Sequence, residues 1–103
     1  MLRIGLFCAS GMSTSILVRK IEEAAAKRNI EVSVAAYPES EMVTLLDQID
    51  VALLGPQVRF FLDKAQKLCG PAHVAVDVIN QMDYGMMNGS KVLDQAIKLK
   101  GEL

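Results

Sequence analysis

Short apolar segments alternate with helix-like segments along this chain, and that alternation limits the folds that the chain can adopt. The third apolar segment, Val51-Ala52-Leu53-Leu54, is continuous, which is typical of a central strand buried on both faces. Strands that alternate with helices predict a parallel sheet, because parallel strands need crossover connections that are usually helical. We therefore expect an α/β fold in three layers, with a four-stranded parallel sheet and helices on both faces.

The expected strand order is 2-1-3-4, the order of a doubly wound sheet, in which strands one and three are neighbours. Ligands bind such sheets at the carboxyl ends of the strands near this switch point, so the loops that follow strands one and three should face each other. Apolar periodicity and turn residues predict four strands, at 2–7, 31–36, 51–54 and 73–76. They predict helices at 12–28, from Met42 toward Ile49, from 55–57 to Gly70-Pro71, and from a Ser90 cap to Lys100. Residues 77–87 are expected to form irregular backbone or a short helix.

Composition restricts the class of protein. The chain has 103 residues, of which 51% are hydrophobic, so we expect one globular domain over 1–103. The formal net charge is −1 and no basic cluster is present, which argues against binding to nucleic acid or to an anionic membrane surface. No apolar run approaches the ~20 residues that a membrane span needs, so we expect no direct membrane insertion.

The cysteines and the termini indicate the compartment. The two cysteines, one in a loop and one in a helix pattern, do not form a disulfide framework. The N-terminus lacks the features of a secretory signal, and no transmembrane part follows at the other end. A free-standing, monomeric cytoplasmic protein is therefore expected.

A cysteine at a strand–helix junction is the candidate catalytic residue. Cys8 follows the first strand directly and precedes the first helix. The first N–H groups of a helix have no intrahelical partner, and the helix dipole is positive there, so a thiolate or a phosphate is stabilised at this position. Alternatively, Cys8 is a small buried apolar residue and the hydroxyl residues after it are ordinary helix caps. The residues expected to bind phosphate are Ala9, Ser10, Gly11, Met12, Ser13, Thr14 and Ser15.

Phosphoryl transfer through a phosphocysteine is the chemistry that this loop favours. Low-molecular-weight tyrosine phosphatases use a similar cysteine loop, but they carry an arginine at the position of Thr14 to clamp the phosphoryl oxygens. Without that charge, a phosphocysteine should form and be handed on but hydrolyse slowly. A small phosphatase without the arginine, and a non-catalytic module that holds free phosphate, are the alternatives.

Other cysteine chemistries fit the sequence less well. A thioredoxin-like site needs a second cysteine where Gly11 stands. A cysteine hydrolase needs a histidine base, and the only histidine, His73, is expected at the opposite edge of the sheet. Cys69 follows the apolar face of a helix and is expected in the core. Zinc-ligand spacing and nucleotide-binding motifs are both absent from the sequence, so no metal and no cofactor are expected.

The loop closely resembles the active loop of the IIB component of the lactose/cellobiose family, in the bacterial phosphoenolpyruvate-dependent sugar phosphotransferase system. The resemblance is carried by Leu6 to Ser15, Tyr37-Pro38-Glu39, Val51 to Gln57, and Asp83-Tyr84-Gly85 with Asn88-Gly89. The run from Met12 to Ser15 is most similar to the cellobiose and chitobiose members.

The resemblance implies a phosphotransferase with two protein partners. A phosphorylated histidine of the IIA protein would donate its phosphoryl group to Cys8. The phosphocysteine would then pass the group to a sugar held by the membrane component IIC, with a β-disaccharide of the cellobiose or chitobiose type expected. The resemblance also implies the strand order given above.

Overall fold

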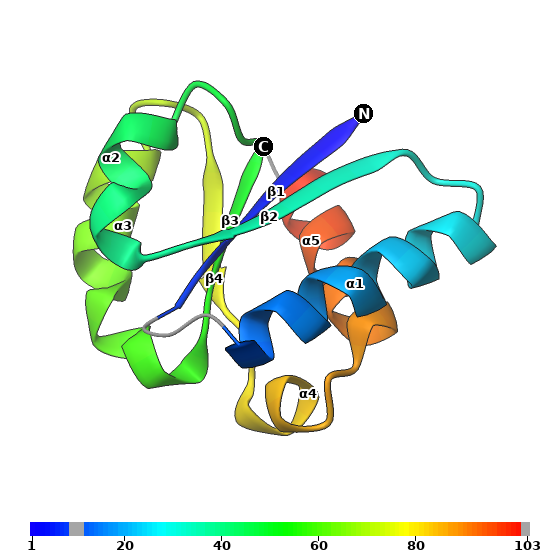
Figure 1. Ribbon diagram of the computed structural model, residues 1–103. Coiled ribbons are helices and arrows are strands. Elements are labelled where there is room, and N and C mark those ends of the chain that lie inside the picture. Colours follow the sequence, from blue (N-terminus) through cyan, green and yellow to red (C-terminus); the bar gives the residue numbers. More distant parts are fainter. Residues whose placement is uncertain (9–11, 102–103) are drawn as a thin grey trace.

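The computed structural model describes residues 1–8 and 12–101, and the side chains of Met12 and Ser13 are outside that description. Strands and helices alternate as the sequence predicts (Figure 1). The strands are β1 (Leu2–Phe7), β2 (Val32–Tyr37), β3 (Val51–Leu54) and β4 (Ala75–Val78). The helices are α1 (Met12–Lys27), α2 (Met42–Leu45), α3 (Leu62–Cys69), α4 (Gln81–Gly85) and α5 (Gly89–Gly101), and the 3₁₀ segments are η1 (Glu39–Glu41) and η2 (Pro56–Phe61).

The sheet has the predicted order β2-β1-β3-β4, and all its pairings are parallel. Strands β1 and β3 are hydrogen-bonded neighbours, with Phe7 opposite Leu54 at their last residues. The carboxyl ends of these central strands therefore lie side by side, which confirms the expected switch point.

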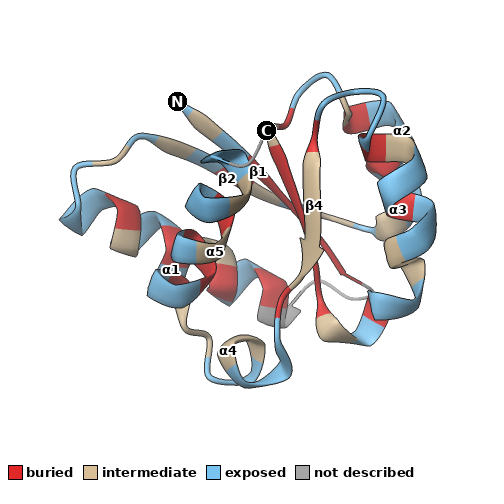
Figure 2. Cartoon of the chain, turned by 180° about the vertical axis from the view of Figure 1, so that it is seen from behind, coloured by how far each residue is buried: buried red, intermediate tan, exposed pale blue. Residues whose placement is uncertain are grey.

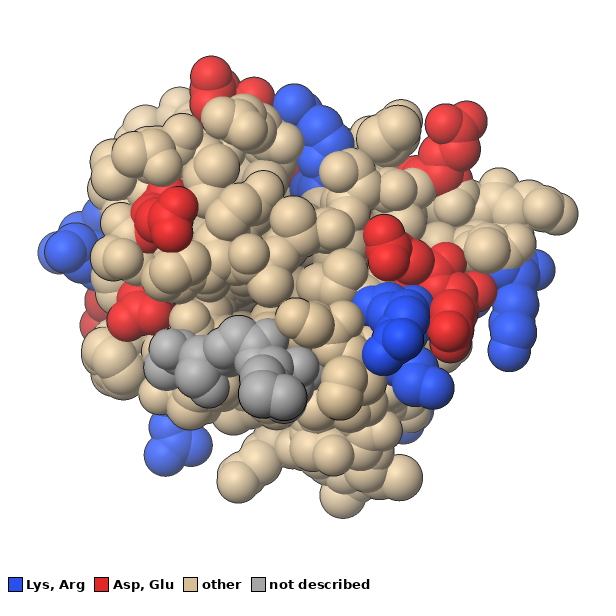
Figure 3. Space-filling view, in the orientation of Figure 1, with Lys and Arg blue, Asp and Glu red and all other residues tan. Residues whose placement is uncertain are grey.

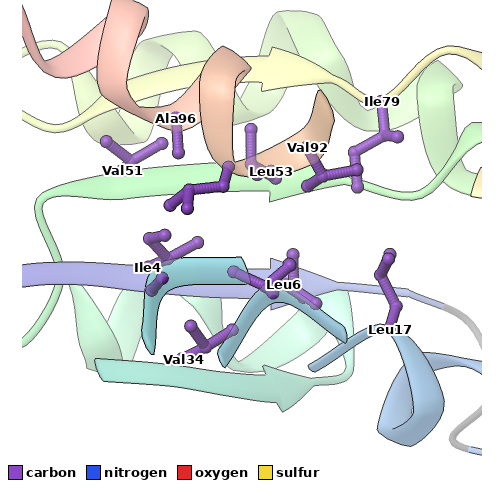
Figure 4. Packing of buried hydrophobic residues seen from close by; sticks show 12 residues of the cluster. Ile4, Leu6, Leu17, Val34, Val51, Leu53, Ile79, Val92 and Ala96 are labelled. Carbon is purple, nitrogen blue, oxygen red and sulfur yellow. The ribbon is translucent and has the colours of Figure 1, made fainter. Parts of the chain in front are cut away.

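Helices cover both faces of the sheet, as expected for three layers (Figures 1 and 2). Successive residues of a strand point to opposite faces, so Leu53 packs with α1 and α5, and Leu54 packs with α2 and α3. All four residues of β3 are buried, which confirms that it is a central strand. Figure 4 shows the first of these two cores, where Ile4, Leu6 and Leu53 meet Leu17 and Val92.

The two helices on the first face approach each other closely. A β-carbon built on Gly89, the first residue of α5, would lie 2.3 Å from the backbone carbonyl carbon of Lys20 in α1. No side chain fits in that space, so glycine sets the distance between these helices. This contact holds the amino end of α5 against α1.

The fourth strand begins two residues later than the sequence predicts. His73 has a positive φ of 59° and lies in a turn. Its N–H donates to the Gly70 carbonyl oxygen at 3.1 Å, and the N–H of Val74 donates to the Cys69 carbonyl oxygen at 3.0 Å. These amides satisfy the carboxyl end of α3, so they do not pair with β3, and the strand extends instead through Asp77 to Val78.

Other boundaries also differ from the prediction, and helix α2 ends at Leu45 rather than continuing toward Ile49. Strand β2 is shifted by one residue, and the segment after Gly55 begins as the 3₁₀ segment η2, with Val58 at non-helical angles, before α3 starts. The cap of α5 is Asn88 rather than Ser90, because the Asn88 Oδ1 accepts from the Lys91 N–H at 3.1 Å. Ser90 lies inside the helix and accepts from the Arg28 guanidinium.

Candidate functional site

Cys8 lies at the carboxyl end of β1, between this strand and the start of α1. Its N–H donates to the Tyr37 carbonyl oxygen at 3.1 Å, which extends the pairing with β2 by one residue. The residue is 4% exposed. Its position at the switch point of the sheet agrees with the sequence prediction.

The predicted phosphate-binding residues fall in two groups. Ala9, Ser10 and Gly11 lie outside the described residues, as do the side chains of Met12 and Ser13. Thr14 and Ser15 lie in the first turn of α1, where Thr14 is 1% exposed and Ser15 is exposed. The 16-residue helix directs its positive dipole end toward this segment, and phosphate binding by the segment stays a prediction.

The loop after β3 faces Cys8, as predicted. The N–H of Gly55 donates to the Phe7 carbonyl oxygen at 3.0 Å. A β-carbon on Gly55 would lie 2.8 Å from the Cys8 sulfur and 2.6 Å from Oε1 of Gln57. The backbone angles at Gly55, φ −63° and ψ 151°, suit any residue. Glycine is therefore needed here for the space beside the sulfur rather than for its conformational freedom.

Tyr84 completes the described part of the site, and reasoning from the sequence assigned it no role. Its hydroxyl oxygen lies 3.9 Å from the Cys8 sulfur and 3.4 Å from the Thr14 hydroxyl oxygen. The Gln57 amide donates to the same hydroxyl at 3.2 Å. The uncharged side chains of Thr14 and Gln57 thus meet at the Tyr84 hydroxyl, which lies beside the Cys8 sulfur.

A capped helix fixes the position of Tyr84. Oδ1 of Asn80 accepts from the Asp83 N–H at 2.7 Å, and Nδ2 of Asn80 donates to the Asp83 carboxylate at 3.0 Å. This reciprocal capping starts α4 just beyond the carboxyl end of β4. The only signal in the sequence was the place of Tyr84 in the Asp83-Tyr84-Gly85 segment, at the same edge of the sheet as Cys8.

A groove of about 590 Å³ borders the site on the side of Gln57 and Tyr84. Its other lining residues are Pro56, Arg59, Phe60, Gln81 and Gly85. Phe60 is 76% exposed. The groove is therefore lined by Gln57 and Tyr84, the two side chains that hydrogen-bond to each other beside Cys8.

The other candidate groups lie away from this edge. Cys69 is fully buried, and its thiol donates to the Met42 sulfur at 3.7 Å. Burial raises the pKa of the Cys69 thiol to about 11, which keeps it protonated and inert and confirms the expectation of a core thiol. His73 lies at the opposite edge, in the turn before β4, so it does not pair with Cys8.

Metal ligands, membrane-spanning helices and surface charge also bear on what this chain can bind. Within residues 1–8 and 12–101, no group of three or more His, Cys, Asp or Glu side chains could hold a metal ion. In this same part of the chain, no helix is both long and apolar enough to cross a membrane. Basic and acidic side chains are interspersed on the face seen in Figure 3, without a concentrated basic patch there.

Known proteins resemble this chain over nearly its full length. Residues 3–95 match the family described as "PTS system, Lactose/Cellobiose specific IIB subunit". A galactose-specific EIIB component and a cellobiose-specific EIIB component, both from Lactococcus lactis, are each 43% identical over 101 residues, which cover 93% of this chain and 94% of each relative. An oligo-beta-mannoside-specific EIIB component from Bacillus subtilis is 37% identical and covers 96% of both chains.

Solved structures are similar in fold. The cellobiose-specific IIB component of Borrelia burgdorferi has a TM-score of 0.81 and 40% identity, covering 98% of this chain and 93% of that one. The lactose-specific IIB domain of Streptococcus pneumoniae has a TM-score of 0.85 at 19% identity, covering 95% of this chain and 96% of that one, which shows a common fold. From the family match and these relatives, the chain belongs to the lactose/cellobiose-specific IIB subunits of the bacterial sugar phosphotransferase system.

Proposed function

We propose that Cys8 is the phosphoryl carrier of this phosphotransferase component. In this proposal Cys8 accepts a phosphoryl group from a phosphohistidine of IIA and passes it to a sugar held by the membrane component IIC. The observation that carries the proposal is the position of the sulfur at the carboxyl end of β1, beside the amino end of α1 and within 3.9 Å of the Tyr84 hydroxyl. A thiolate is the reactive form of cysteine, and a helix amino end favours it.

The transfer has two displacement steps at phosphorus. In the first, a sulfur electron pair forms the S–P bond, and the electrons of the N–P bond stay on the histidine nitrogen of IIA. In the second, a sugar hydroxyl oxygen attacks the phosphorus, the S–P electrons return to sulfur, and a base of the sugar-bearing subunit takes the hydroxyl proton. Splitting the transfer in this way is nucleophilic catalysis, and Cys8 is regenerated as a thiolate.

Slow hydrolysis of the phosphocysteine follows from the neutral site. Thr14 stands where the related phosphatases carry their arginine, and it contacts the Tyr84 hydroxyl. Arg3 and Arg28 are paired with Asp50 and Asp94, and Arg59 lines the groove at η2 rather than the segment that follows Cys8. We therefore propose a carrier rather than an arginine-less phosphatase. Steady turnover of an aryl phosphate by the purified protein would favour the phosphatase.

A further part of the proposal concerns which sugar receives the phosphoryl group. The relatives are named for galactose, cellobiose and oligo-beta-mannoside. We infer a β-disaccharide of the cellobiose or chitobiose type for this chain, from the resemblance of its Met12 to Ser15 run. The test is sugar phosphorylation by membranes that contain its IIC partner. Galactose phosphorylated in preference to both disaccharides would contradict this inference.

We also propose that the chain acts as a single domain, as a monomer and in the cytoplasm. A small globular chain with a formal net charge of −1 and no basic cluster in its sequence suits transient exchange between two partners. Light scattering with and without IIA would give the oligomeric state, and a stable dimer would contradict the proposal.

The decisive experiment compares the two cysteines. Phosphorylated IIA is mixed with the wild type, Cys8→Ser or Cys69→Ser, and phosphorylation is followed by intact-protein mass spectrometry. Cys8→Ser should lose acceptance completely, because a serine hydroxyl is far less ionised than a thiol at neutral pH. Cys69→Ser should accept normally while it stays folded, although its buried hydroxyl lowers stability. Acceptance by folded Cys8→Ser, or its loss in folded Cys69→Ser, would overturn the assignment.

A further inference from the structure

The hydroxyl of Tyr84 lies at the centre of a set of polar contacts around Cys8. It lies 3.9 Å from the Cys8 sulfur, 3.4 Å from the Thr14 hydroxyl oxygen and 3.2 Å from the amide nitrogen of Gln57. These partners come from the residue after β1, from α1 and from η2, and Tyr84 itself comes from α4. The proposed carrier function places the sulfur beside Tyr84 but gives the tyrosine no role, so the tyrosine needs its own explanation.

The donors and acceptors of these three contacts agree with a tyrosine proton that points to the sulfur. A phenolic hydroxyl has one proton and two acceptor lone pairs, whereas a thiolate can only accept. The Gln57 amide nitrogen can only donate, so it occupies one lone pair of the Tyr84 oxygen. All three contacts are satisfied when Thr14 donates to the second lone pair and Tyr84 donates its proton to the sulfur.

This arrangement strengthens the bond to sulfur. A hydroxyl that accepts two hydrogen bonds is polarised and becomes a better donor, and a bond to a charged acceptor is about twice as strong as a neutral one. Tyr84 is partly buried, and its capped helix α4 holds it in place, so little entropy is lost in making the bond.

We propose that Tyr84 is a further catalytic residue of this site, which stabilises the Cys8 thiolate through its hydroxyl, and that Gln57 is the positioning residue that orients that hydroxyl. The inference rests on the proposed role of Cys8 as the phosphoryl carrier. A neutral donor stabilises negative charge on the sulfur when the S–P electrons return to it. It does so without the arginine clamp that would also favour attack by water.

The test is the pH profile of Cys8 alkylation by iodoacetamide in wild type and Tyr84→Phe, with Cys8 resolved from Cys69 by peptide mass spectrometry. The substitution keeps the ring and removes only the hydroxyl. Alkylation at pH 7 should fall about tenfold or more, which is the lower end of the effect expected from loss of a hydrogen bond to a charged group. The midpoint of the profile should move to higher pH, and the two rates should converge at high pH, where the thiol is fully ionised in both proteins.

Two variants complete the design. Tyr37→Phe is the matched control, because Tyr37 ends the neighbouring strand β2 and packs its ring against Phe7 at 5.7 Å between centroids. It removes a tyrosine hydroxyl at the same edge of the sheet and should leave the pH profile of Cys8 alkylation unchanged. Gln57→Leu removes the donor that orients Tyr84 and should lower the rate at pH 7 about two- to threefold. If Tyr84→Phe does not fold, as judged by circular dichroism, Gln57→Leu decides the question.

The outcomes separate this inference from the proposed function. A Tyr84→Phe profile that matches the wild type would overturn the inference. So would a loss of rate that persists undiminished at high pH, because that result indicates altered access to the sulfur. If Cys8→Ser loses phosphoryl acceptance and Tyr84→Phe shows no shift, only the role of Tyr84 fails. If folded Cys8→Ser still accepts phosphate from IIA, the carrier proposal fails whatever the profiles show.

Discussion

The two edges of the sheet are built from different kinds of side chain. At the carboxyl edge, Cys8 is surrounded by Thr14, Gln57 and Tyr84, which are all uncharged. At the amino edge, the carboxylate of Asp50 accepts from the backbone N–H and the guanidinium of Arg3 and lies 3.6 Å from Nζ of Lys100. Among the described residues, the proposed carrier thiol therefore lies at the edge with uncharged neighbours, and the ion pairs of Asp50 lie at the opposite edge.

The difference shows what each edge contributes. The ion pairs at the amino edge join the start of β1, the residue before β3 and the end of α5, so they act on stability. The described donors beside Cys8 are neutral, and the amino end of α1, where the helix dipole is positive, begins four residues after Cys8. The two cysteines follow the same division, because Cys69 lies in an apolar core beside Met42 and Cys8 lies among hydrogen-bonding groups. Burial alone does not distinguish the proposed carrier thiol from the core thiol, since both are buried.

The largest effect is expected from Gly55→Ala, which changes the carboxyl edge beside Cys8. The added methyl group would lie 2.8 Å from the Cys8 sulfur and 2.6 Å from Oε1 of Gln57, so both groups must move. We expect about a tenfold or larger loss in the rate of phosphoryl acceptance from IIA, and a loss of about 1–3 kcal/mol in the free energy of unfolding. Stopped-flow or quench-flow transfer assays and urea unfolding give the two quantities.

The matched control for this variant is Gly101→Ala. A β-carbon on Gly101 meets nothing within 4 Å, so the substitution should change neither quantity measurably. Normal transfer by Gly55→Ala would mean that the loop after β3 adapts to the methyl group. In that case the space beside the sulfur is not set by this glycine.

The second prediction concerns the inert thiol. Burial raises the pKa of Cys69 from its ordinary value of 9.0 to about 11. Below pH 9 the thiol is neutral in both the folded and the unfolded state, so the stability of the folded state does not change with the ionisation of Cys69. Between pH 9 and 11 it ionises first in the unfolded state, so stability falls by about 2 kcal/mol, at 1.36 kcal/mol for each pH unit. Cys69→Ala, which cannot ionise, should lose that part of the alkaline slope.

The measurement is the difference in free energy of unfolding between wild type and Cys69→Ala at several pH values from 8 to 11. The other titrating groups are common to both proteins, so they cancel in the difference. A difference that stays constant over this range would mean that water or a polar group reaches the thiol. The contrast between the two cysteines would then be weaker than the structure indicates.

The sequence predicted the topology because the relevant signals are local. The continuous run from Val51 to Leu54 and the spacing of apolar residues in the helices determine where strands and helices form and which faces they bury. The boundary of β4 was wrong because a polar residue, Asp77, lies within the strand, while His73 and Val74 use their amides in the turn after α3. Such competition for amides depends on backbone geometry that apolar patterns do not record.

The site could be predicted only in part for a similar reason. Cys8 was identified because a strand, a cysteine and a helix follow one another directly in the sequence. Tyr84 is 76 residues away from Cys8, and its role depends on α4, whose cap and position become visible only in the folded chain. The function of Gly55 in making room for the sulfur likewise depends on the pairing of β1 with β3.

The smallest effect is expected from Asp50→Asn, at the amino edge of the sheet. Hydrogen bonds from Arg3 lower the pKa of Asp50 to about 2 from its ordinary 3.8. The depressed pKa means that the stabilisation is complete above pH 3.8 and is lost as the pH falls toward 2. Asp50→Asn should lower the free energy of unfolding by about 1 kcal/mol at pH 7, a modest figure because solvent screens the exposed guanidinium, and the two proteins should converge in stability near pH 2.

Asp47→Asn is the control, since Asp47 accepts from Arg3 through its backbone carbonyl. Phosphoryl acceptance should be unchanged in both variants at pH 7, because the site at the opposite edge uses neutral donors. A transfer defect in folded Asp50→Asn would show that the two edges are coupled through the sheet.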